Sequence, residues 1–161
     1  MKKILMALIC SMLSVTVLHA KTNVPQFSDY PVKSVYTGKT AQLDLSDDYA
    51  RMFRTRLRDA LKEKPDFAGE YVITMWGCGA SCRMYSFVSK RTGKLLNAGF
   101  GGEQNAEDVI ASKANSRLLV TQEEHTNENW EVESLTTRFY ILEKGKFKLL
   151  KAVKTAAPKE E

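Results

Sequence analysis

Apolar residues recur at helical spacing in one segment of the chain, residues 46–65. Ser46 can cap the amino end of this segment, and the carboxylates of Asp47 and Asp48 suit the positive end of a helix dipole. Pro65 ends the pattern. The segment therefore predicts an amphipathic helix whose apolar face consists of Tyr49, Met52, Phe53, Leu57, Ala60 and Leu61.

After Pro65 the pattern changes to short runs rich in β-branched and aromatic residues, which is typical of strands. A turn is expected at residues 90–94, where the sequence reads KRTGK, and a polar surface loop at residues 123–133. The predicted strands are residues 70–76, 83–89, 95–100, 108–112, 117–122, 137–143 and 147–153.

The amino terminus has a different pattern. Lys2 and Lys3 precede an apolar run at residues 4–18, and small Ala20 comes before the polar sequence KTN. A positive head, an apolar middle and a small residue at the end are typical of a cleavable secretory signal peptide. The run has 15 residues, whereas a membrane-spanning helix needs about 20. We therefore expect residues 1–20 to be removed, with cleavage after Ala20.

Export of the chain changes its expected composition and location. Removing 20 of the 161 residues leaves 141, which suits one domain with its own core. Loss of two lysines lowers the net charge from +5 to +3, and the basic residues are scattered rather than clustered. The sequence therefore predicts a secreted, periplasmic protein that binds no nucleic acid and does not insert stably into a membrane after cleavage.

The remaining chain divides into three expected parts. Residues 21–45 are polar with two prolines and predict an extended arm with one short strand around residues 32–36. Residues 46–154 predict a single domain, and residues 155–161 a disordered tail. The predicted fold class is α+β, with one amphipathic helix packed on an antiparallel sheet of five to six strands.

Two cysteines remain after export, because Cys10 leaves with the signal peptide. Cys78 and Cys82 are separated by three residues, and in an oxidising compartment such a pair most simply forms a disulfide. The bridge would close a loop of five residues, which the chain-entropy formula values at about 2 kcal/mol. Its effect would therefore be local.

Other functions for this segment remain open. Thiol redox catalysis normally uses two intervening residues, and no lysine or histidine lies beside the pair to lower a thiol pKa. Metal binding needs more ligands than the pair offers, so no metal site and no cofactor are expected. The third alternative is that the turn presents backbone N–H groups to an anion or a partner. The residues of this candidate binding turn are Trp76, Gly77, Gly79, Ala80 and Ser81.

Catalytic combinations are sparse in the rest of the chain. His125 has no serine or cysteine beside it, and the glycines at residues 100–105 are not followed by GKS or GKT. The adjacent carboxylates at residues 123–124 would diverge in a strand rather than form an acid and base pair. We therefore expect no catalytic residues and no enzyme activity.

The sequence resembles a group of small exported bacterial proteins, largely uncharacterised, that share a helix, an FAGxY step and a WGCGxxC turn. The matching residues are FRTRLRDALKEKPDFAGEYVITMWGCGASC at 53–82, TGK at 92–94 and SRLLV at 116–120. The resemblance implies a periplasmic setting and a cysteine pair at Cys78 and Cys82. It implies no ligand and no catalytic residue.

Two functions follow as hypotheses. The first is a non-catalytic binding or inhibitory protein of the immunity type, which acts by contact with a periplasmic or exported protein. The alternative is a periplasmic thiol redox or envelope-stress protein that uses Cys78 and Cys82.

Overall fold

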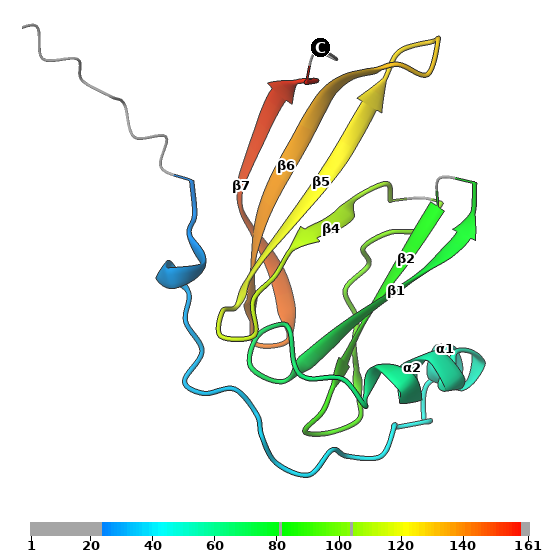
Figure 1. Ribbon diagram of the computed structural model, residues 1–161, viewed down its shortest axis with the longest axis vertical. Coiled ribbons are helices and arrows are strands. Elements are labelled where there is room, and N and C mark those ends of the chain that lie inside the picture. The colour runs from blue at the N-terminus through cyan, green and yellow to red at the C-terminus, as the bar shows by residue number, and fades with distance from the viewer. Residues whose placement is uncertain (1–23, 81, 104, 159–161) are drawn as a thin grey trace, which may run out of the picture.

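The computed structural model describes residues 24–80, 82–103 and 105–158 (Figure 1). The predicted signal peptide at residues 1–20, Ser81 and the last three residues lie outside the described residues. Within the described part, the helical elements are η1 (Phe27–Asp29), α1 (Asp48–Met52) and α2 (Arg54–Ala60). The strands are β1 (Tyr71–Gly79), β2 (Cys82–Ser89), β3 (Leu95–Leu96), β4 (Asp108–Ala111), β5 (Leu118–Thr126), β6 (Val132–Glu143) and β7 (Lys146–Ala156).

Strands β1, β2 and β3 form an antiparallel sheet that is covered on both faces. Successive residues of a strand point to opposite faces. Val72 and Trp76 on β1 therefore pack on the same side, against residues of α1 and α2 that include Ala50, Leu57 and Ala60. Ile73 and its neighbours on the other side pack against the second sheet.

The second sheet is antiparallel and has the order β4-β5-β6-β7. Phe87 from the first sheet and Leu119 and Leu142 from the second belong to one buried cluster, which places the main core between the sheets. Phe147 on β7 joins this cluster, with its ring centroid 5.5 Å from that of Phe87. The two sheets thus bury apolar surface against each other.

The arm before α1 connects the two sheets. Val24, Phe27 and Tyr30 pack against buried residues on the outer face of the second sheet. Farther along, the backbone N–H of Ala41 donates to the carbonyl of Lys90 at 2.9 Å, beyond the end of β2. Figure 1 shows the arm running past the four-stranded sheet and then below β1 and β2 to α1.

The predicted fold class was wrong. The described part of the chain is mostly antiparallel β, with seven strands in two sheets, rather than one sheet of five to six strands with a helix packed on it. After β3 the chain crosses over to form β4 on the second sheet. Gly101 lies on this crossing with φ +77°, and a Cβ there would approach the carbonyl oxygen of Arg83 to 2.1 Å. The hydrophobic pattern does not encode this close approach between residues far apart in the sequence.

The prediction of a single long helix at residues 46–65 was also wrong. The predicted segment forms two short helices, α1 and α2, and α2 has only seven residues. Phe53 lies between them with φ −102° and ψ 19°, and its ring centroid is 4.8 Å from that of Trp76. Asp47, rather than Ser46, caps α1 by accepting the Ala50 N–H at 3.1 Å. Packing on Trp76 therefore accompanies a break that helical periodicity does not predict.

Strand lengths differ from the predicted bounds in the second half of the chain. β5 and β6 extend into the predicted loop, which leaves residues 127–131 between them. β7 continues to Ala156, so it includes the first two residues of the predicted tail. Among the described residues, no helix has the length and apolar character needed to cross a membrane.

Candidate functional site

A disulfide closes the turn between β1 and β2. Cys78 and Cys82 are bonded, with their Cα atoms 5.1 Å apart. The strand register shifts between Gly77 and Gly79, and Gly79 pairs with Cys82 as the last pair of the hairpin. The cysteine pair predicted from the sequence is thus a staple at the end of two strands.

The predicted binding turn divides into buried and exposed parts. Gly77, Gly79 and Ala80 are exposed around the disulfide, and Gly79 has φ +148°, a conformation that residues with a Cβ rarely adopt. Trp76 is only 6% exposed and packs with Tyr49 and Phe53 under the guanidinium of Arg56. Trp76 therefore holds the hairpin on the helices and leaves the small residues at the surface.

The outer edge of β1 is blocked along its first half only. The N–H of Tyr71 donates to the carbonyl of Phe67 at 3.0 Å, and the N–H of Ile73 donates to Asp66 Oδ1 at 2.9 Å. By alternation, Met75 and Gly77 point their N–H and C=O groups to the same side. Within the described residues, β2 is the only strand that pairs with β1, so the second half of this edge is free.

Side chains at this free edge carry no charge from Thr74 to Ala80. Met75 is 50% exposed and shares a strand face with the half-buried Ile73. On the opposite face, Thr74 borders a shallow pocket with Arg56, Asp59 and Glu63. The free edge is therefore apolar on one face and polar on the other.

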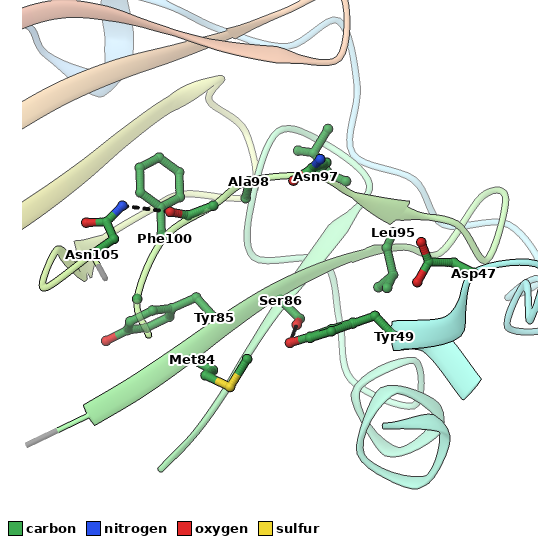
Figure 2. A pocket seen from close by; sticks show the side chains of 13 residues that line it. Asp47, Tyr49, Met84, Tyr85, Ser86, Leu95, Asn97, Ala98, Phe100 and Asn105 are labelled. Carbon is green, nitrogen blue, oxygen red and sulfur yellow. Dashed lines mark hydrogen bonds between the residues drawn. The ribbon is translucent and has the colours of Figure 1, made fainter. Parts of the chain in front are cut away.

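A pocket of about 660 Å³ lies between β2, the residues before α1 and the crossing segment after β3 (Figure 2). The segment 97–99 bows away from β2 between two points of backbone contact, Leu96 with Phe87 and Gly101 with Met84. Figure 2 shows Asp47 at one end of the pocket and Asn105 at the other. The bow thus opens a hollow beside an otherwise continuous strand pairing.

Two hydroxyl groups meet in the wall of this pocket. Tyr49 Oη and Ser86 Oγ are 2.9 Å apart and share a hydrogen bond, which Figure 2 shows. Burial raises the pKa of Tyr49 above its usual range. Asn105 donates to the carbonyl of Gly99 at 2.6 Å and so holds the bowed segment. These contacts give the pocket a fixed shape.

A smaller polar pocket adjoins the disulfide. Ala80 and Cys82 line it together with Arg83 and Asp108. Arg83 forms an ion pair with Asp108, whose other oxygen accepts the Tyr85 hydroxyl at 3.0 Å. The cation next to Cys82 is therefore compensated by a carboxylate rather than available to stabilise a thiolate.

A charged cluster lies on the inner face of the second sheet. Arg138 Nη1 is 2.7 Å from Glu123 Oε2 and 3.2 Å from Glu107 Oε1, as ion pairs without hydrogen-bond alignment. Glu107 also accepts hydrogen bonds from Thr121 at 2.7 Å and from Tyr140 at 3.1 Å. Burial and the Glu107 carboxylate raise the pKa of Tyr140 to about 12. Each charged or hydroxyl group in this cluster forms an ion pair or a hydrogen bond with another member, which is typical of a structural role.

The sequence hypotheses missed the pocket and the cluster. In the sequence, Asp47 and Glu123 stand out only as members of adjacent acidic pairs, whereas the structure places Asp47, Ser86 and Asn105 around one pocket. His125 bonds Thr136 Oγ1 at 2.7 Å, far along the chain from the cysteines. Within the described residues, no three metal-binding side chains gather in one place.

No protein-family model matches this chain, and neither the curated proteins nor the solved structures contain a significant match to it.

Proposed function

We propose that the chain is an exported, non-catalytic binding protein that acts by contact with another periplasmic or exported protein. The single observation that carries this proposal is the free, uncharged edge of β1 at residues 75–79. Unpaired backbone groups on an edge strand readily accept another extended chain. The partner is therefore an extended segment that adds a strand to β1.

The chemistry of the two faces defines the partner segment. Apolar side chains on it would meet Met75 and Ile73, and polar side chains on it would meet Thr74 and the charged residues of α2. The partner is thus an alternating strand rather than an amphipathic helix. The disulfide supports this use because it fixes the end of the accepting strand before binding.

The difference between the edge strands β1 and β7 also supports strand addition at β1. β7, the outer strand of the second sheet, carries Lys146, Lys148, Lys151 and Lys154. Lysines on an edge discourage pairing with another chain, and the free half of β1 has none. A protein selected only against edge pairing would protect both strands.

Photocrosslinking can identify the partner and the edge together. A photoreactive amino acid placed at position 75 should crosslink one extended segment of a periplasmic or exported protein, and the same group at position 148 on β7 should not. A synthetic peptide of the captured segment should then slow hydrogen exchange at the Met75 and Gly77 amides, because both would become ladder donors.

A substitution that adds a charge to the free edge of β1 tests strand addition most directly. Met75→Lys should weaken binding of that peptide at least tenfold, whereas Met52→Lys, the same change at a 72% exposed position on α1, should leave binding unchanged. Equal binding by the Met75→Lys protein, or equal crosslinking from position 148, would contradict strand addition. A crosslink to a second copy of the chain would replace the proposed partner with self-association.

A further inference from the structure

The pocket between β2 and the bowed segment has the size and lining of a small-molecule site. Its volume of about 660 Å³ falls within the usual range of ligand pockets, about 300–1,000 Å³. Apolar side chains from β2, β3 and the crossing segment form much of its wall. They are Met84, Leu95, Leu96, Ala98 and Phe100.

Among the described residues that line the pocket, Asp47 alone carries a charged side chain. Its Oδ1 accepts the Ala50 N–H, and none of the ion pairs among the described residues includes it. The neighbouring carboxylates differ, because Asp48 pairs with Arg51 and Asp44 lies 3.9 Å from Lys94 Nζ. An exposed carboxylate that belongs to none of these ion pairs therefore lies at one end of a pocket whose wall is partly apolar (Figure 2).

The chemistry of the lining selects among ligand classes. The described residues in the wall include one carboxylate and no cationic side chain, so the pocket disfavours anions. The linked hydroxyls of Tyr49 and Ser86 can accept a hydrogen bond from a ligand but add no charge. A cationic donor joined to an apolar chain satisfies both the carboxylate and the wall.

We propose that this pocket binds a small primary alkylammonium ligand. The ammonium group lies at the Asp47 carboxylate, and the alkyl chain lies against Leu95, Met84 and the bowed segment. This proposal is independent of strand addition at β1, because residues 75–79 do not line the pocket. It adds a second binding site of different chemistry to the same domain.

Titration with hexylammonium, followed by amide chemical shifts of the full exported chain, tests the proposal. Shifts should concentrate at residues 84–86 and 95–101. Hexanol and hexanoate, which keep the chain and change the head group, should bind at least tenfold more weakly. Methylammonium should also bind more weakly, by up to about fourfold for each methylene that the pocket buries.

Asp47→Asn removes the charge and keeps a good helix cap, so α1 should still form. Affinity for hexylammonium should fall at least tenfold. Asp48→Asn is the matched control, because it removes a neighbouring carboxylate that is outside the pocket wall. Equal affinity in the Asp47→Asn protein, equal binding of hexanoate, or shifts spread over the surface would overturn the proposal.

Discussion

The two longest edge strands, β1 and β7, limit pairing with other chains in different ways. β7 carries lysines along its length, whereas β1 relies on Asp66 and Phe67 to occupy its first half and leaves its second half free. The free half of β1 ends at the Cys78–Cys82 disulfide. β7 begins after the β6–β7 turn, which contains no disulfide. An edge strand can therefore be closed to other chains along only part of its length. In β1 the part that stays open lies next to the turn that the disulfide fixes.

The largest expected loss of stability comes from truncating a side chain in the core between the two sheets, against which both β1 and β7 pack. Phe87 is fully buried and its ring contacts Phe67 before β1 and Phe147 on β7. Phe87→Ala should lower the free energy of unfolding by about 3–5 kcal/mol. Urea unfolding followed by fluorescence and by circular dichroism should show one shared transition. Two separate transitions would mean that the sheets, and hence the edges, are stabilised independently.

Removing the disulfide should have a smaller effect, confined to the β1 side. The double variant Cys78→Ser, Cys82→Ser should lose about 2 kcal/mol, because it restores freedom to a five-residue loop in the unfolded chain. Hydrogen exchange should quicken near residues 76–84 and remain unchanged in β6 and β7.

The β6–β7 turn gives a matched control for that prediction. Lys144 and Gly145 have φ +50° and +74°, so backbone conformation closes this turn without a bridge. Gly145→Ala should cost about 1 kcal/mol, with faster exchange only around residues 142–147. If loss of the disulfide quickened exchange in both hairpins, the staple would hold the whole fold rather than one edge.

Part of this architecture could be predicted from residue patterns. Runs rich in β-branched and aromatic residues located β1 and β2, at the predicted strands 70–76 and 83–89. The division into two sheets could not be predicted in the same way. It depends on where the chain crosses after β3, and at this crossing Gly101 lies close to the backbone of Arg83, which is distant in the sequence.

The candidate sites differ in the same respect. The cysteine pair was visible because its two residues are close together in sequence and act together. The pocket is lined by Asp47, Ser86 and Asn105, which lie far apart in the sequence. None of them forms a recognisable motif with its neighbours, and only the fold brings them together. The free edge required knowledge of which strand lies outermost, which hydrophobic alternation does not give.

A pH effect should distinguish the second sheet from the first. Burial and Glu107 raise the pKa of Tyr140 to about 12, above its ordinary value of 10.0. A raised pKa in the folded state contributes stability that is present below pH 10 and is lost as the pH rises through 12. Tyr140→Phe should flatten this alkaline decline in thermal unfolding scans. An unchanged decline would show that other groups cause it.

The smallest expected effect lies at the blocked half of the β1 edge. Burial raises the pKa of Asp66 above its usual 3.8, although its carboxylate accepts the Ile73 N–H. The stability contributed by this group is present below pH 3.8 and is lost as the pH rises through the folded-state pKa. Asp66→Asn keeps an oxygen for Ile73 and removes a partly desolvated charge.

This variant should therefore unfold at a slightly higher temperature than the parent at pH 7, and the difference should shrink toward pH 3. Glu128→Gln, at an exposed position in the β5–β6 loop, should show no such trend. Faster exchange of the Ile73 amide in the Asp66→Asn protein would contradict the expected hydrogen bond. It would mean that the negative charge itself keeps the first half of β1 closed to other strands.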